Sequence, residues 1–187
     1  MNKTSKKYQF LTALKHIIFT TIICLVMCFF LIPINSAYEW TIWFSQIILI
    51  GLFVVSIYVP FWEFGYNDRN YVNINKKKED ILQGTKIGFL ISIPYFVTSF
   101  LMILVRLNVV KWLSYLFLVF NSYFYYFIDS MIAKPDPALT PWWIIAVFVV
   151  MPLFIPFVSS IGYVLGYKEI SIKEKLLYKK VMSEDKK

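Results

Sequence analysis

Four long apolar stretches constrain the fold of this 187-residue chain more than any other feature of its sequence. A helix that crosses a bilayer needs about 20 mostly apolar residues, because each residue adds about 1.5 Å toward a hydrocarbon core of about 30 Å. The predicted spans are about 17–34, 40–62, 87–105 and 141–166. They predict an all-α integral membrane protein, a small polytopic helical bundle that forms a single membrane domain over residues 1–187.

The composition excludes a water-soluble protein and a disordered one. Hydrophobic residues make up 59% of the chain, aromatic residues 20% and charged residues only 16%, whereas a soluble domain carries about 25% charge. Disordered chains are polar and poor in aromatic residues. The formal net charge of +8 indicates cytoplasmic loops and contact with anionic lipid in a membrane protein. We expect no binding to nucleic acid, because no aromatic platform accompanies the basic loops.

The segment 112–128 is apolar and aromatic but short, and Asn121-Ser122 interrupts it. If this segment crosses the membrane, giving five transmembrane helices, 10 Lys and Arg residues lie inside and 9 outside. If it does not cross, the division is 16 inside against 3 outside, as the positive-inside rule requires. We therefore predict four transmembrane helices plus one re-entrant or interfacial segment, with five transmembrane helices as the alternative. Both termini are then cytoplasmic.

Two interpretations account for the interrupted segment. In the first it is a re-entrant hairpin, in which two half-helices of about 13 Å meet at Asn121-Ser122 deep in the protein. Four charged residues would lie at its outer ends and could pair: Arg106, Lys111, Asp129 and Asp136. In the second it is an interfacial helix whose aromatic run 123–127 belongs to the aromatic belt of the membrane. The density of aromatic residues favours the interfacial helix.

Two pairs of glycines predict close helix packing. Gly84 and Gly88 open the third span, and Gly162 and Gly166 close the last one. Small residues four apart let helix backbones approach closely. With four crossings the two pairs lie at the same cytoplasmic depth, and we expect them to face each other. The alternative is that glycine is simply common in membrane helices.

The most polar part of the chain is the cytoplasmic loop expected at residues 63–84. Gly65 is expected to end the second helix in a left-handed conformation. The candidate residues for binding an anionic lipid head group are Asp68, Arg69, Asn70, Lys76, Lys77 and Lys78. Arginine offers a planar fork that suits phosphate, and the lysines raise the local concentration of anions. The alternative is a solvated turn whose lysines merely follow the positive-inside rule.

The basic tail, residues 167–187, places an apolar stripe between lysines. This pattern predicts a short amphipathic helix that lies on the inner leaflet. The alternative is that the tail docks onto a partner subunit.

No motif predicts catalysis or metal binding. His16 is the only histidine and lies at the cytoplasmic end of the first span. Cys24 and Cys28 lie one helical turn apart and are interpreted as small packing residues, because neither a Cys-x-x-Cys spacing nor a histidine partner accompanies them. None of the four spans carries a charge at its centre, which argues against a proton relay or a membrane carboxylate enzyme. We expect no cofactor, no metal and no catalytic residue.

Short loops, glycine pairs and proline-bent spans favour a non-catalytic membrane protein, either transport-related or an accessory subunit. One alternative is a membrane enzyme that acts on phosphate-bearing lipid at the cytoplasmic face. Another is an immunity or stress protein that packs against another membrane protein. The expected partners are lipids of the anionic inner leaflet and a second membrane subunit. The abundance of Lys, Asn, Ile, Phe and Tyr suggests an AT-rich bacterial genome and hence a bacterial plasma membrane.

Overall fold

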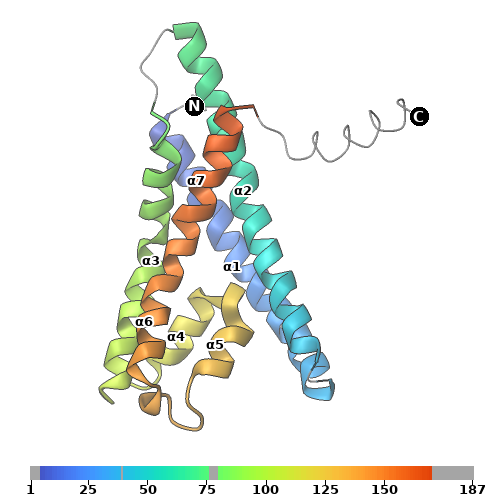
Figure 1. Ribbon diagram of the computed structural model, residues 1–187, viewed down its shortest axis with the longest axis vertical. Helices are drawn as coiled ribbons and strands as arrows, with labels where there is room; N and C mark the ends of the chain where they lie inside the picture. Colours follow the sequence, from blue (N-terminus) through green and yellow to red (C-terminus); the bar gives the residue numbers. More distant parts are fainter. Residues whose placement is uncertain (1–4, 39, 76–79, 170–187) are drawn as a thin grey trace, which may run out of the picture.

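The computed structural model describes residues 5–38, 40–75 and 80–169, and its regular elements in these ranges are all helices. Four long helical stretches run along the longest axis of the molecule (Figure 1). They are α1, Lys6–Ala37; α2, Thr41–Asn75; α3, Gln83–Arg106; and the run of α6, Trp142–Val150, η3, Met151–Leu153, and α7, Phe154–Tyr167. Each stretch is long and apolar enough to cross a membrane. The chain is therefore a multi-pass helical membrane protein, as predicted.

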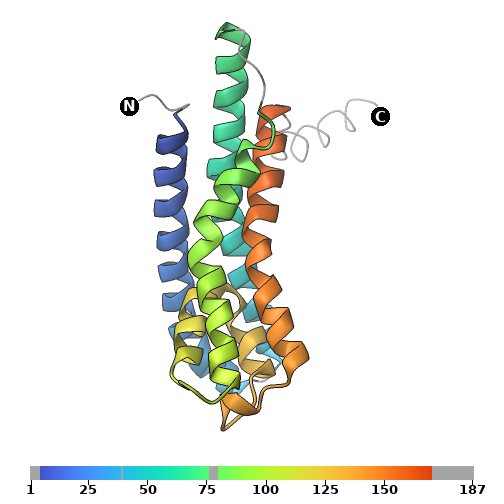
Figure 2. The same cartoon turned by 90° about the vertical axis from the view of Figure 1, so that its left-hand side faces the viewer.

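The long helices alternate in direction, so the bundle has two distinct ends (Figures 1 and 2). Helix α1 begins and α7 ends at one of them, which we call the termini end. The α1–α2 turn and the connections between α3 and α6 lie at the other, which we call the hairpin end. Helices α2 and α7 run in the same direction and pack together, and α7 also packs against α3.

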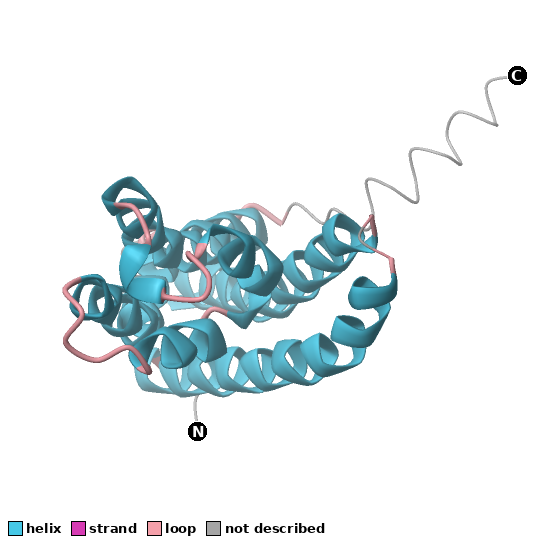
Figure 3. Ribbon diagram, turned by 90° about the horizontal axis from the view of Figure 1, so that it is seen from below, coloured by secondary structure: helices cyan, strands magenta, loops and turns pink. Residues whose placement is uncertain are grey.

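The interrupted segment is a helical hairpin that does not cross the bundle. Its elements, with the short turn that follows it, are α4, Leu113–Phe120; η1, Ser122–Phe124; α5, Tyr125–Met131; and η2, Pro137–Leu139. The pair α1 and α2 diverges from α3 and α6 toward the hairpin end, and the hairpin fills this wedge (Figures 1 and 3). Both of its arms open toward the same end of the bundle. This is the re-entrant arrangement.

The expectation of an interfacial helix is therefore wrong, and burial explains why. An aromatic belt needs its rings at the membrane surface. In the structure Tyr123 is fully buried and Tyr126 is 7% exposed. The aromatic run marks a protein core because α1 and α2 supply the walls that enclose it.

The expected loop after residue 62 is also wrong in its first half, because α2 continues to Asn75. Gly65 is not a left-handed cap, since no described glycine has a positive φ. Phe64 and Asp68 are buried along this extension, and the ring of Tyr66 stacks on that of Trp62. Tertiary contacts on one face hold these polar turns in a helix, as is usual for helices in proteins.

A proline interrupts the last long stretch. Pro152 lies in η3, the 3-10 turn between α6 and α7. Proline has no backbone N–H and removes one hydrogen bond of an α-helix. The stretch continues in the same direction beyond the interruption, so the fourth candidate span is continuous from Trp142 to Tyr167.

The interior forms two apolar clusters, and much of the surface is apolar as well. The larger cluster lies among α1, α2, α3, α7 and the turn of the hairpin. The smaller one lies at the hairpin end, among α3, α6 and the two arms of the hairpin. Large side chains such as Phe29, Trp43 and Ile47 are about 70% exposed. A surface of this kind is expected where a helix faces lipid rather than water.

Candidate functional site

The apex of the hairpin is held to α2 by the side chain of Gln46. Its Nε2 donates to the carbonyl oxygen of Tyr123 at 2.7 Å, and its Oε1 accepts from the backbone N–H of Phe127 at 3.0 Å. Both backbone groups lie at the break between α4 and α5, where helical hydrogen bonds are missing. Lipid offers no hydrogen bonds, so the glutamine satisfies groups that are costly to bury unpaired.

Polar groups of α1 bind the other side of the apex. The hydroxyl of Ser122 donates to the carbonyl oxygen of Thr21 at 3.3 Å, and the thiol of Cys28 lies 3.8 Å from the carbonyl oxygen of Ser122. Asn121 is fully buried and donates from Nδ2 to the carbonyl oxygen of Phe117. The predicted break at Asn121 and Ser122 is thus the buried turn of the hairpin.

Aromatic rings surround this turn. The ring of Tyr123 stacks on Phe53 of α2 with the ring centroids 3.7 Å apart, and it also lies near Phe124 and Phe154. Such ring pairs add stabilisation of about 0.5–1.5 kcal/mol each beyond the burial of their area. Aromatic packing as well as hydrogen bonds therefore holds the turn of the hairpin in the bundle.

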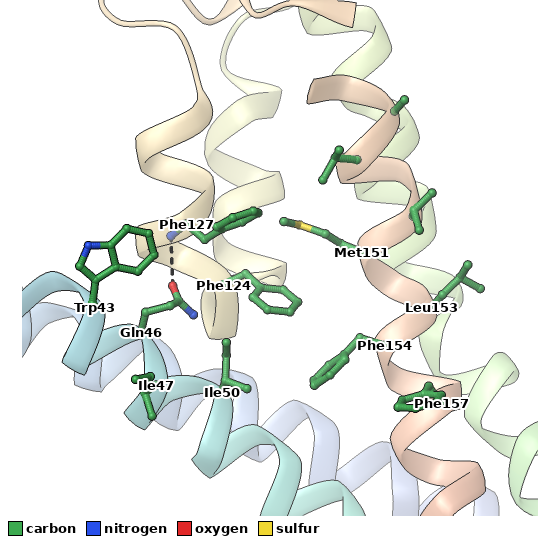
Figure 4. Close-up of a pocket in the computed structure, with 13 residues that line it drawn as sticks. Trp43, Gln46, Ile47, Ile50, Phe124, Phe127, Met151, Leu153, Phe154 and Phe157 are labelled. Atoms are coloured by element: carbon green, nitrogen blue, oxygen red, sulfur yellow. Dashed lines mark hydrogen bonds between the residues drawn. The ribbon is translucent and has the colours of Figure 1, made fainter. Parts of the chain in front are cut away.

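A lateral groove of about 1030 Å³ lies between α2, the hairpin and the α6–α7 run (Figure 4). Helix α2 contributes one wall, η3 and α7 the opposite wall, and Phe124 and Phe127 lie between them. The residues that line it are Trp43, Gln46, Ile47, Ile50, Phe124, Phe127, Ala146, Val147, Val150, Met151, Leu153, Phe154 and Phe157. Two of these lining residues, Trp43 and Gln46, have side chains that form strong hydrogen bonds. The amide of Gln46 is already bonded to the hairpin.

The rims of the groove are exposed on the lipid-facing surface. Trp43 is 70% exposed on α2, and Phe157 is 63% exposed on α7. The groove therefore opens sideways, in the direction in which a membrane protein meets lipid.

Charged residues tie the connections at the hairpin end. Lys111 pairs with Asp136 at 2.7 Å, as the hairpin interpretation anticipated, and Lys134 pairs with Asp129 at 2.8 Å. The hydrogen bond from Lys111 holds the pKa of Asp136 below its usual range, so the pair persists until the pH falls below that range. Arg106 forms no such pair with a described residue; it donates to the carbonyl oxygen of Ala138 at 2.8 Å.

The termini end holds a buried polar cluster around Asp68. Three side chains donate to its carboxylate: Nε2 of Gln9 at 2.9 and 2.8 Å, Nε2 of Gln83 at 3.1 Å and the hydroxyl of Tyr163 at 2.9 Å. Gln83 also donates to Oε1 of Gln9. The four residues come from α1, α2, α3 and α7, one from each long stretch. We call this set the Asp68 cluster.

The structure separates the residues predicted to bind a head group. Asp68 points into the bundle and is 8% exposed. Arg69 points to the end of α7 and pairs with Glu169 at 2.8 Å. Asn70 is half-buried on α2, and Lys76, Lys77 and Lys78 lie outside the described residues, as does most of the basic tail, 170–187. Head-group binding stays a prediction. Among the described candidate residues, Arg69 has a partly exposed positive charge.

The predicted glycine pairs lie at the same end of the bundle, but they do not face each other. A Cβ on Gly84 would overlap Tyr163, and one on Gly88 would lie 2.8 Å from Cα of Pro156, so this pair packs against α7. Gly162 and Gly166 pack instead against α2. The reason is that α7 lies between α2 and α3 and needs a close approach on both sides. On the α2 side of this contact lies Gly65, where a Cβ would overlap the carbonyl oxygen of Tyr163.

Three members of the Asp68 cluster were missed by sequence reasoning: Gln9, Gln83 and Tyr163. Each is a polar residue near the end of an apolar stretch, where polar residues are ordinary. Only the tertiary arrangement shows that all three meet one carboxylate.

The two cysteines lie inside the bundle, as expected for packing residues. Cys24 and Cys28 are buried and unpaired with each other, and no described group of three or more His, Cys, Asp or Glu side chains is placed to hold a metal ion. Comparisons with protein-family models, curated proteins and solved structures found no match for this chain.

Proposed function

We propose that this chain is a non-catalytic membrane protein, transport-related or accessory, that holds the hydrocarbon chain of a lipid or lipid-linked molecule in its lateral groove. The observation that carries the proposal is the groove itself, whose glutamine amide is already used to anchor the hairpin. A pocket of this kind takes hydrocarbon and offers little to a polar group.

The size and position of the groove support this class of ligand. Its volume of about 1030 Å³ lies just above the range of about 300–1,000 Å³ that is usual for ligand pockets. It opens between spans toward the lipid-facing surface, so a chain enters from the bilayer without passing through water. The head group of such a ligand would remain outside the groove.

The hydrogen bonds around the groove support a binding role over a catalytic one. The apex groups Asn121, Ser122 and Gln46 all bind the backbone of the hairpin or of α1. These contacts hold the groove wall in place. Catalysis on a lipid phosphate, the alternative considered above, receives less support because the oxygens of Asp68 already accept three donors from neighbouring helices.

Photo-cross-linking tests this proposal. The protein is reconstituted with a phospholipid that carries a diazirine near the end of its acyl chain, and cross-linked peptides are identified by mass spectrometry. We expect the cross-links to concentrate on α2 around Ile47 and Ile50 and on α7 around Phe154. The variant Ala146→Trp fills the groove from α6 and should lose most of these cross-links.

The matched control is Val26→Trp, which adds the same ring to an exposed position of α1 that does not line the groove. This variant should keep the cross-linking pattern of the parent. Cross-links that spread evenly over all lipid-facing helices, and that Ala146→Trp leaves unchanged, would show that the groove has no preferred occupant and would reject the proposal.

A further inference from the structure

The Asp68 cluster joins all four long stretches through one carboxylate. Gln9 lies in the first turns of α1, Gln83 begins α3, and Tyr163 lies near the end of α7. All three donate to Asp68, which lies 28 residues into α2. An ionisable residue buried within a membrane helix bundle is a candidate functional group by default, because such a residue is costly to keep there.

The donors of the cluster match the charged form of the carboxylate. Oδ2 of Asp68 accepts three hydrogen bonds, from Gln9, Gln83 and Tyr163. Oδ1 accepts one, also from Gln9. An ionised carboxylate is an acceptor at both oxygens, whereas a protonated one carries an O–H donor of its own. Hydrogen bonds to the ionised form are also the stronger ones. Protonation therefore weakens every contact that Asp68 makes across the bundle.

The charges nearest to the cluster lie at its rim. Asp80, before α3, binds Lys86 at 2.9 Å and Lys6 of α1 at 3.9 Å, and Tyr163 lies 3.4 Å from the carbonyl oxygen of Asp80. On α2, Arg69 is turned toward Glu169. The hydrogen bonds to Asp68 described here thus come from neutral donors, and its charge is balanced through those donors rather than through an ion pair.

The helices next to the Asp68 cluster pack closely, because α2 and α3 both approach α7 at glycines. Gly84 lies directly against Tyr163, and Gly65 lies against the backbone at Tyr163 and Tyr167. A shift of Tyr163 therefore moves α7 relative to both α2 and α3. Tyr163 therefore takes part in both contacts: its side chain packs against Gly84 of α3, its backbone packs against Gly65 of α2, and its hydroxyl donates to Asp68.

We propose that Asp68 is a proton-controlled latch: ionised, it holds the termini ends of α1, α2, α3 and α7 together, and protonated, it lets α1 and α7 separate there. This role is independent of the lateral groove, which lies toward the hairpin end.

Spin-label distance measurements test the latch. Labels are placed on the exposed positions Lys7 of α1 and Lys168 after α7, in full-length protein with Cys24→Ala and Cys28→Ala, reconstituted in nanodiscs. We expect a single population of distances between the labels at neutral pH. A longer population should appear as the pH falls toward the ordinary range of aspartate, about 4.

Three variants separate the latch from simple packing. Asp68→Asn should show the longer population at every pH, because the amide group is a neutral donor. Tyr163→Phe keeps the ring but removes one donor to the anion, so the midpoint of opening should move upward by about one to two pH units. Asp80→Asn, at the rim, should open at nearly the parent's pH.

The latch is rejected if the distance between the labels does not depend on pH over this range. It is also rejected if Asp68→Asn and Asp80→Asn respond alike, or if Tyr163→Phe leaves the midpoint in place. The last comparison stays informative even where Asp68→Asn fails to fold.

Discussion

At the scale of single residues, the close contacts of α7 depend on glycines, which have no side chain to separate the helices. Gly65 and Gly166 each bring a Cα to the backbone of the neighbouring helix, where even a methyl group has no room. The sequence pointed to Gly162 and Gly166 through their spacing, but it assigned the wrong partner helix. The prediction for Gly65 was wrong because a glycine after an apolar stretch is a common helix end. In the structure Gly65 packs against the backbone of α7, about 100 residues later in the chain.

We expect Gly65→Ala to lower the free energy of unfolding by about 1–3 kcal/mol, because overpacking of this size is typical for a methyl group forced into a filled contact. The measurement is thermal or denaturant unfolding in detergent. Gly51→Ala serves as the control, since a Cβ on Gly51 meets nothing within 4 Å. That change should be neutral or stabilising by up to about 1 kcal/mol. Equal effects of the two substitutions would show that the α2–α7 contact is looser than described.

At the scale of elements, the four spans were predictable and the hairpin only in part. Apolar length alone identifies a span, since the bilayer fixes the number of residues needed. The break at Asn121 and Ser122 was visible in the sequence, but an aromatic run is equally compatible with a membrane surface and with a core. What decides between them is the buried amide of Gln46, some 80 residues earlier, which satisfies the broken backbone.

We expect Gln46→Leu to destabilise the protein by about 2–6 kcal/mol, because the carbonyl of Tyr123 and the N–H of Phe127 each lose a buried partner and each costs about 1–3 kcal/mol. Unfolding in detergent measures the loss. The control is Ser130→Ala on the same hairpin, whose hydroxyl is exposed and donates to the carbonyl oxygen of Phe127 in its own helix. If both variants unfold alike, the apex of the hairpin is not anchored through Gln46.

At the scale of the whole molecule, the counts of basic residues on the two sides predicted the arrangement of the bundle better than hydropathy did. Hydropathy alone leaves the segment 112–128 open as a fifth span, whereas the positive-inside rule favours four spans. The described helices agree: α1 begins and α7 ends at one end, and the connections between α3 and α6, which contain Lys111 and Lys134, lie at the other. The Asp68 cluster lay beyond prediction, because it joins residues 9, 68, 83 and 163, whose proximity is a property of the packed bundle.

Labelling of single cysteines with a membrane-impermeant maleimide tests this arrangement in intact cells. In a background with Cys24→Ala and Cys28→Ala, Lys111→Cys and Lys134→Cys should both react from outside, and Lys168→Cys only after the cells are permeabilised. A segment 112–128 that crossed the membrane would place positions 111 and 134 on opposite sides. Reaction of only one of these two would therefore contradict the re-entrant hairpin.

The hairpin also has a consequence for the order in which the protein assembles during synthesis. Its anchoring partners, Thr21 and Gln46, belong to α1 and α2 and leave the ribosome before it does. The opposite wall of the groove belongs to η3 and α7, which leave the ribosome after the hairpin. We expect the hairpin to dock first onto the α1–α2 pair, with its outer side open to lipid. On the proposal that the groove holds a hydrocarbon chain, we expect α7 to close around a chain that already lies there, so that the groove receives its first ligand during biogenesis.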